Sequence, residues 1–272
     1  MCPDTAEYSV RSAAHQQGRA STVFSLGLAL FCAQADLVRA ADIKVWTARA
    51  IATVLAEVGP EFERQTGHEL SIASDLAPAF VRRADAGESF DVMITGSAPL
   101  VGLANQGKII PDTRTPIARS GIGVEVRAGA PKPDISSVEA FKRTLLNAKS
   151  IAYLKDVGSG IHVGRVLERL GIADAIKGKV IRPESDIVSE LVAKGEVELG
   201  IVVITQILTT PGVDLVGPLP PDLQSYVVFE AGVSANSKQP AAARALIRFL
   251  TGPVATRVIT AQGMELQMGA SK

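Results

Sequence analysis

Residues 42–95, DIKVWTARAIATVLAEVGPEFERQTGHELSIASDLAPAFVRRADAGESFDVMIT, contain three short apolar runs separated by two helical patterns. The apolar runs, which are typical of buried strands, are 42–47, 69–74 and 90–95. The segments between them, 48–66 and 78–86, carry apolar residues at helical spacing, and each is followed by a glycine. Strands that alternate with helices of roughly 10–20 residues indicate βαβ units and a parallel sheet.

The alternation of strands and helices continues over the rest of the chain. Segment 121–127 (GIGVEVR) is typical of a strand, whereas segment 214–221 is rich in proline and is expected to be a loop. The pattern breaks near Arg119 and again near Gln224, and the segments outside this block would complete one another. The chain is therefore predicted to form two α/β lobes.

The predicted lobes comprise residues 42–118 plus 225–272, and residues 119–224. Two crossing segments would join them. Open α/β sheets bind ligands beyond the carboxyl ends of their strands, and binding sites prefer domain boundaries. We therefore expect a ligand cleft between the two lobes.

Residues 1–40 are typical of a secretory signal sequence. Basic side chains lead it, at Arg11, His15 and Arg19. An apolar run follows at 22–32 and is shorter than the roughly 20 residues that a membrane span needs. Val38 and Ala40 give small side chains at the positions that a signal peptidase reads, which predicts cleavage after Ala40 and a periplasmic mature chain.

Two alternatives for this segment are a buried N-terminal helix and a lipoprotein anchored at Cys32. Phe31 disfavours the lipoprotein, because lipid-attachment cysteines are usually preceded by a small residue. The chain has two cysteines, Cys2 and Cys32, and both lie in the expected leader. The mature protein is therefore expected to have no disulfide and no cysteine metal site.

Composition narrows the function further. The formal net charge of zero gives no indication of a basic face, so nucleic acid is not an expected partner. With 4% aromatic residues, the core must be aliphatic and a stacking site for a sugar is disfavoured. His68 and His162 are the histidines that survive processing, too few for a histidine metal site. No cofactor or metal is expected.

Five segments together resemble type II periplasmic substrate-binding proteins, in the branch related to molybdate-binding proteins. The segments are PEFERQTGHEL (60–70), FDVMITGS (90–97), LANQGKII (103–110), ARSGIGVEVRAGAPKPDI (118–135) and GEVELGIVVIT (195–205). The resemblance runs from Val45 to Gly252. It implies a two-lobed binding protein for a small anion that acts as a monomer with an ABC-type permease.

Two loops depart from the molybdate-binding pattern, which is rich in serine and glycine. They read Thr47-Ala48-Arg49 and Ser74-Asp75-Leu76 here. Tetrahedral oxyanions are usually held by neutral hydroxyls and backbone N–H groups at helix starts. An arginine and an aspartate in these loops therefore favour another ligand, and an organic di- or tricarboxylate is the class we expect.

Charged groups in the expected cleft are Arg49 and Lys155. Arg49 follows the first strand and could fork onto a carboxylate, although a solvated first-turn arginine is the alternative. Lys155 ends a strand, and the DVGSG turn after it could present Ser159 and Gly160 to an anion. A plain strand-to-helix turn is the alternative for that segment.

Further polar residues end strands or lie where the chain crosses between lobes. The predicted ligand contacts among them are Thr47, Ser74, Thr95, Ser120 and Thr205. Asp75 could contact the ligand or cap a helix, since aspartate is a favoured N-cap residue. Ser97 is a second candidate cap, for the helix expected to begin near Ala98.

Three functions are compatible with these residues. The first is a solute receptor of an ABC-type importer that closes around a small carboxylate. The second is an isomerase, since the resembling branch includes aconitate isomerases; His162, Lys155 or Asp75 would then be the base. The third is a molybdate or tungstate receptor, which Arg49 disfavours.

Overall fold

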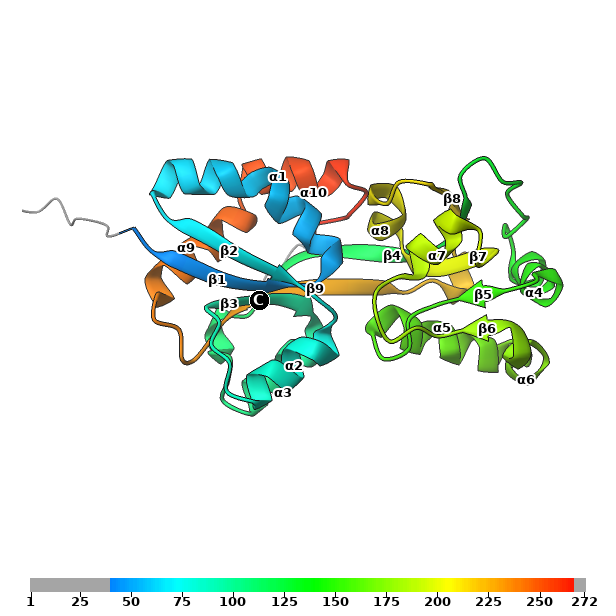
Figure 1. Ribbon diagram of the computed structural model, residues 1–272, viewed down its shortest axis with the longest axis horizontal. Helices are drawn as coiled ribbons and strands as arrows, with labels where there is room; N and C mark the ends of the chain where they lie inside the picture. The colour runs from blue at the N-terminus through cyan, green and yellow to red at the C-terminus, as the bar shows by residue number, and fades with distance from the viewer. Residues whose placement is uncertain (1–39, 267–272) are drawn as a thin grey trace, which may run out of the picture. The chain divides into compact units, whose positions relative to one another are not determined.

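The computed structural model of the chain describes residues 40–266. The expected leader, apart from Ala40, lies outside the described residues. One nine-stranded mixed sheet runs through the described part, in the order β2-β1-β3-β9-β4-β7-β5-β6, with β8 paired to β4 (Figure 1). The strands are β1 (Asp42–Thr47), β2 (Glu69–Ser74), β3 (Val92–Gly96), β4 (Thr115–Arg127), β5 (Ile151–Ala152), β6 (Val180–Ile181), β7 (Leu199–Val203), β8 (Val213–Pro218) and β9 (Tyr226–Val233).

The first half of the sheet consists of β2, β1, β3, β9 and residues 115–121 of β4. Strands β1, β2 and β3 are parallel, as the βαβ pattern predicted. Strand β9 is antiparallel to β3 and to β4, so the sheet is mixed and its parallel part is the part that the βαβ pattern covers. The antiparallel direction brings the amino end of β9 to the carboxyl end of β3.

The second half consists of residues 122–127 of β4 together with β7, β5, β6 and β8. Strands β5, β6 and β7 are parallel, whereas β4 is antiparallel to β7 and β8. Strand β8 corrects the expected loop at 214–221. Its proline lies at the last position, Pro218, where the missing N–H is tolerated, and its residues are only partly buried.

Helices cover both faces of each half (Figure 1). They are α1 (Arg49–Thr66), α2 (Ala77–Asp85), α3 (Ser97–Asn105), α4 (Val138–Asn147), α5 (Gly158–Arg169), α6 (Ala173–Ile176), α7 (Val188–Lys194), α8 (Ile204–Thr209), α9 (Pro240–Leu250) and α10 (Pro253–Ala261). Short 3₁₀ turns lie at Pro111–Thr113, Lys177–Lys179 and Pro221–Leu223.

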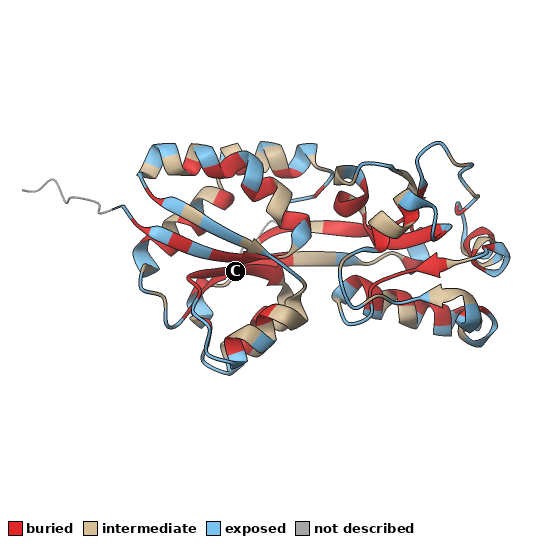
Figure 2. Ribbon diagram, viewed as in Figure 1, coloured by how far each residue is buried: buried red, intermediate tan, exposed pale blue. Residues whose placement is uncertain are grey.

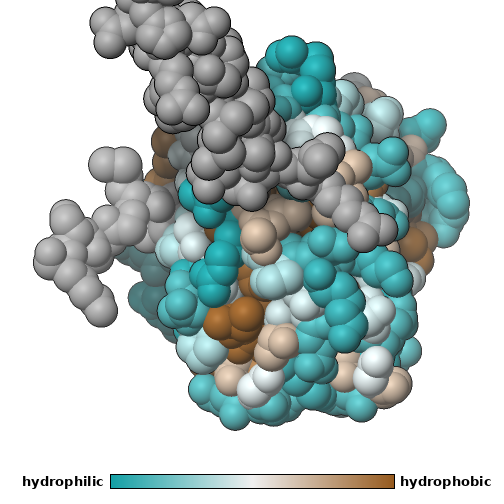
Figure 3. Space-filling model, turned by 90° about the vertical axis from the view of Figure 1, so that its left-hand side faces the viewer, coloured by the Kyte–Doolittle hydropathy of each residue, from teal (hydrophilic) through white to brown (hydrophobic). Residues whose placement is uncertain are grey.

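Separate hydrophobic clusters fill the two halves. In the first half, one cluster packs α1, α9 and α10 on the sheet, and another packs α2 and α3 on its opposite face. In the second half, α4, α5 and α6 pack on one face and α7 and α8 on the other. Figure 2 shows the buried residues along the strands and on the inner sides of the helices. The described outer face of the first half in Figure 3 is mostly hydrophilic.

Strand β4 belongs to both halves. Its residues 115–121 pair with β9, and residues 122–127 pair with β7 and β8. The backbone therefore crosses from one core to the other between Gly121 and Ile122. This pairing supports our proposal that the halves form two lobes, with the first crossing between residues 121 and 122 instead of the expected 118 and 119.

Candidate functional site

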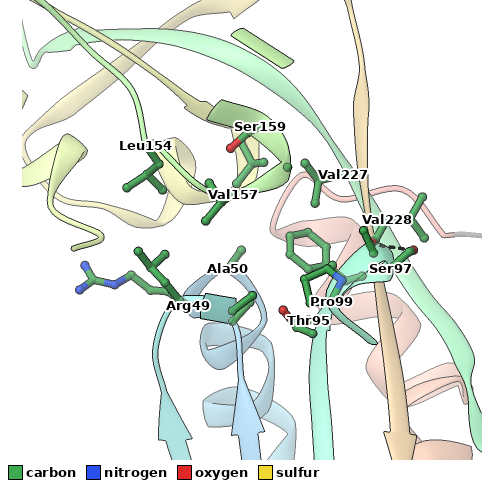
Figure 4. Close-up of a pocket in the computed structure, with 18 of the residues that line it drawn as sticks. Arg49, Ala50, Thr95, Ser97, Pro99, Leu154, Val157, Ser159, Val227 and Val228 are labelled. Carbon is green, nitrogen blue, oxygen red and sulfur yellow. Dashed lines mark hydrogen bonds between the residues drawn. The ribbon is translucent and has the colours of Figure 1, made fainter. Parts of the chain in front are cut away.

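A cavity of about 550 Å³ lies between the two halves of the sheet. Figure 4 shows Leu154, Val157 and Ser159 on one side of it, with Arg49 and Thr95 opposite. Its size is in the range of small-molecule sites. Most of its wall is apolar, formed by Leu76, Pro99, Leu154, Val157, Ile161, Val203, Val227, Val228 and Phe229.

Four helices point their N-termini into this cavity. The first residues of α1, α2, α3 and α5 line it, and none of these helices has a side-chain cap. Helix α4, which begins elsewhere, is capped by Ser137, whose Oγ accepts from the N–H of Ala140 at 3.1 Å. Uncapped N-termini offer free N–H donors and a favourable field for negative charge. The cavity therefore has the donors that an anion requires.

Three hydroxyl groups add to these donors. Thr95 is the penultimate residue of β3, Ser97 begins α3, and Ser159 lies in the first turn of α5. Within residues 40–266, neither the Thr95 nor the Ser159 side chain has a hydrogen-bond partner, although both residues are at least 94% buried. The Ser97 Oγ donates to the Val228 carbonyl at 3.3 Å. Ser97 is the first helical residue, so the expected cap role for it is wrong.

Arg49 reaches across the cavity to the second half of the sheet. Its Nε lies 3.4 Å from Asp186 Oδ2, and its Nη1 lies 2.5 Å from Glu190 Oε1. In Figure 4 the guanidinium points away from Thr95 and Ser97. Arg49 lines the cavity as predicted, but its charge is engaged by two carboxylates of the protein.

Three carboxylates line the same cavity, those of Asp75, Asp156 and Asp186. Burial raises the pKa of Asp186, and the effect is partly offset by Arg49 and by Gln206. The Gln206 Nε2 donates to Asp186 Oδ1 at 2.8 Å. The Asp75 Oδ1 accepts from the N–H of Leu76 at 2.7 Å, and Leu76 is the N-cap residue of α2. Asp75 thus precedes the cap position that the sequence suggested for it.

Six of the nine predicted ligand contacts lie outside the lining of the cavity: Thr47, Ser74, Ser120, Lys155, Gly160 and Thr205. Thr47 is fully buried, and its Oγ1 donates to the Ala48 carbonyl at 3.2 Å. Ser74 is exposed at the end of β2. The Ser120 Oγ is buried and accepts from the N–H of Thr205 at 3.2 Å. Ser120 and Thr205 therefore join β4 to α8, beside the place where the chain crosses between the halves.

The segment after β5 is divided between cavity and core. Ser159 faces the cavity, whereas Lys155 is exposed outside the lining. Gly160 is buried, and a Cβ there would lie 1.6 Å from the Leu154 carbonyl oxygen. The His162 Nε2 lies 2.8 Å from the Leu223 carbonyl oxygen, also outside the lining. Gly160 therefore packs against the backbone of Leu154, and His162 contacts the backbone of Leu223; neither residue lines the cavity.

Several lining residues were missed from the sequence. Ser225, Tyr226, Val227, Val228 and Phe229 line the cavity because β9 is antiparallel and starts there. Asp186 and Gln206 follow β6 and β7. The signal for these two was available, since polar residues beyond the carboxyl ends of strands are the usual ligand contacts of such sheets.

Neither a metal centre nor a membrane-spanning helix is found within residues 40–266. No group of three or more histidine, cysteine, aspartate or glutamate side chains in this range could hold a metal ion. No helix within the same residues combines the length and the apolar character that crossing a membrane requires.

Residues 43–265 match the family of bacterial extracellular solute-binding proteins. The chain belongs to this family. Aconitate isomerase from a Pseudomonas species is 33% identical over 229 residues, which cover 82% of this chain and 87% of that protein. Molybdate-binding protein ModA from Azotobacter vinelandii is 28% identical over 252 residues, which cover 90% and 97%.

Solved structures of type II periplasmic binding proteins share the fold. The periplasmic molybdate-binding protein of Azotobacter vinelandii matches with a TM-score of 0.71 and 23% identity, covering 83% of this chain and 100% of that chain. The sulfate-binding protein SubI of Mycobacterium tuberculosis matches with a TM-score of 0.71 and 18% identity, covering 85% and 88%. The expected α/β fold of a two-lobed binding protein is therefore confirmed.

Proposed function

We propose that this family member is a periplasmic solute-binding protein that captures a small organic di- or tricarboxylate. The supporting observation is the convergence of four uncapped helix N-termini and three hydroxyl groups on one cavity. Such donors stabilise carboxylate oxygens without any metal. Occupied lobes would present the solute to an ABC-type permease, the partner that the fold leads us to expect.

The apolar wall favours an organic anion over a bare oxyanion. A carboxylate ligand carries a carbon skeleton that can pack against Leu154, Val157 and Val227, whereas a tetrahedral oxyanion cannot. Burying apolar surface contributes about 25 cal/mol per Å². The relatives named for molybdate make that anion the natural competitor, and it belongs in every binding test.

The test is calorimetry on residues 41–272 with citrate, tricarballylate, succinate, molybdate and sulfate. We expect at least one carboxylate to bind and molybdate to bind more weakly. Replacing the Thr95 hydroxyl with a methyl group, in Thr95→Val, should reduce carboxylate affinity about tenfold or more, because a hydrogen bond to a charged group contributes about 1.5–3 kcal/mol.

Thr260→Val is the matched control. Thr260 is exposed on α10, and its Oγ1 donates to the Thr256 carbonyl at 2.9 Å. It is not among the residues that line the cavity. Its affinity should equal that of the unmodified protein. Tight binding of molybdate with no response to carboxylates would overturn the proposed ligand class.

A second candidate function is isomerisation of an unsaturated tricarboxylate. The observation that favours it is the 33% identity to aconitate isomerase. Of the bases considered from the sequence, Asp75 lines the cavity, and Lys155 and His162 do not. Moving a proton along the carbon chain needs such a base beside the bound substrate.

Proton NMR of the protein with cis- and trans-aconitate in D₂O tests this second function. Interconversion with deuterium uptake would mean catalysis, and it should be lost in Asp75→Asn. Binding of both isomers without conversion would mean that the chain acts as a receptor only.

A further inference from the structure

Arg49 makes an unusual connection between the two halves of the sheet. It opens α1 in the first half, whereas Asp186 and Glu190 belong to the loop before α7 and to α7 in the second half. Among the ion pairs formed within residues 40–266, only those of Arg49 join one half to the other. This contact therefore bridges the cavity.

The acceptor side of the contact is held in place by its own hydrogen bonds. The Asp186 side chain is 10% exposed; its Oδ1 accepts a hydrogen bond from the Gln206 Nε2, and its Oδ2 forms the ion pair with Arg49. Such a buried carboxylate cannot easily turn to solvent. Glu190 binds Arg49 through Oε1, while its Oε2 is buried without a partner in the described part of the chain. The shorter contact of Arg49 is therefore the one to Glu190, whereas the printed hydrogen bond to Asp186 comes from Gln206.

Arg49 is the only cationic side chain among the described residues that line the cavity, and both carboxylates form ion pairs with it. A ligand carboxylate that uses Arg49 must compete with them for the same N–H donors. Arginine prefers paired carboxylate oxygens in a fork geometry. Asp186 and Glu190 therefore engage the Arg49 donors that a ligand carboxylate would need.

We propose that Arg49, Asp186 and Glu190 form an ion-pair latch that holds the two halves together across the cavity and competes with the ligand. The competition rests on the proposed carboxylate binding, whereas the latch itself does not. Removing the carboxylates should open the empty protein and free Arg49 for the ligand.

Interspin distances in the ligand-free protein test the latch. Residues 41–272 contain no cysteine, so labels can be placed at Arg82→Cys on α2 and Asn147→Cys on α4, both exposed. Double electron–electron resonance should give a longer or broader distance distribution when Asp186→Asn and Glu190→Gln are combined. Arg49→Gln should give the same change, and adding it to the double variant should give no further change.

Glu61→Gln is the control, because it removes the Arg64–Glu61 ion pair within α1 and one negative charge without touching a contact between the halves. Its distance distribution should equal that of the unmodified protein. Identical distributions for the latch variants and the unmodified protein would overturn the proposal.

Calorimetry with citrate and tricarballylate tests the competition. The double variant should bind at least about tenfold more tightly than the unmodified protein, and Arg49→Gln more weakly. Weaker binding by the double variant would overturn the competition, since Asp186 and Glu190 would then support the ligand. If no carboxylate binds any variant while the distance change occurs, the latch stands and the proposed ligand is wrong.

Discussion

Position 160 requires glycine because it packs closely against the backbone that follows β5. A Cβ at this position would lie 1.6 Å from the Leu154 carbonyl oxygen, so α5 can approach β5 only with glycine there. The sequence suggested instead that Gly160 exposes its N–H to an anion. The close approach also fixes where Ser159 faces the cavity, which links a packing requirement to the site.

Gly160→Ala is therefore expected to destabilise the protein by more than about 2 kcal/mol, because backbone atoms must shift to relieve the clash. Gly164→Ala in the same helix is the control. A Cβ at Gly164 meets no atom within 4 Å, so that variant should gain about 0.5–1 kcal/mol. Chemical denaturation of both variants measures the difference, and equal stabilities would contradict the packing argument.

Thr205 carries a buried hydroxyl whose Oγ1 has no hydrogen-bond partner among the described residues. An unsatisfied buried hydroxyl costs about 1–3 kcal/mol. Thr205→Val keeps the shape and removes that cost, so we expect equal or greater stability and unchanged ligand affinity.

Thr209→Val is the comparison for this prediction, because the Thr209 Oγ1 donates to the Thr205 carbonyl at 2.9 Å. That variant should lose stability, since it removes a satisfied bond. A loss of ligand affinity in Thr205→Val would mean that Thr205 contacts the ligand, as the sequence suggested.

At the scale of elements, apolar runs with clear ends were predictable. The strand at 42–47 and the helix ending at Thr66 agree with the structure because burial on one face sets their periodicity. The strand at 69–74 also has the expected bounds, although none of its residues is buried. Strand β8 was missed because all of its first five residues are partly buried, which leaves no alternation. The first part of β4 was missed because Pro116 lies there, at an irregularity of the pairing with β9.

The candidate site was predictable only in part, for a related reason. Arg49, Thr95 and Ser159 follow parallel strands, and the rule for parallel sheets places them at the cavity. The wall formed by β9 depends on an antiparallel pairing that periodicity does not reveal. The partners of Arg49 lie 137 or more positions away in the sequence, beyond the reach of any local pattern.

Helix α3 offers a test of the uncapped N-termini. Its N-cap residue, Gly96, has φ −58° and ψ 149°, and an added Cβ would come no closer than 3.9 Å to Pro99 Cδ. Gly96→Asp should stabilise the protein by about 0.5–1 kcal/mol through capping and reduced freedom of the unfolded chain. The same carboxylate should weaken anion binding at least about tenfold, because it takes the N–H donors and adds negative charge.

Gly96→Ala separates the two effects. It restricts the unfolded chain without adding an acceptor, so its ligand affinity should stay within about twofold of the unmodified protein. Thermal denaturation and calorimetry on both variants measure stability and binding. Undiminished binding by Gly96→Asp would mean that the anion does not use the N-terminus of α3.

At the scale of the whole molecule, the second half of the sheet carries a buried acid close to the Arg49 contact. Glu125 on β4 is fully buried, and its Oε1 and Oε2 accept from the Ser189 Oγ at 2.9 and 3.0 Å. Opposite it on β7, Gly200 leaves the space that the carboxylate fills, since a Cβ there would lie 2.3 Å from Oε1. Burial raises the pKa of Glu125 to about 7.

This raised pKa makes the stability of the protein depend on pH in a defined window. Below the ordinary value of 4.5 Glu125 is protonated in both the folded and the unfolded state. Between pH 4.5 and about 7 the unfolded chain releases the proton while the folded protein keeps it, so stability falls as pH rises. Above about pH 7 both states are ionised and the loss, on the order of 3 kcal/mol, is complete.

Glu125→Gln removes this dependence while its amide oxygen can still accept from Ser189. Relative to the unmodified protein, we expect the variant to gain on the order of 3 kcal/mol more stability at pH 8 than at pH 5. Ser189→Ala should instead make the loss of stability with rising pH larger. The Ser189 hydrogen bond lowers the pKa of Glu125, so its removal should let burial raise that pKa further. Urea denaturation at the two pH values measures both differences. A Glu125→Gln variant that loses stability with pH as the unmodified protein does would mean that Glu125 is already ionised in the folded state.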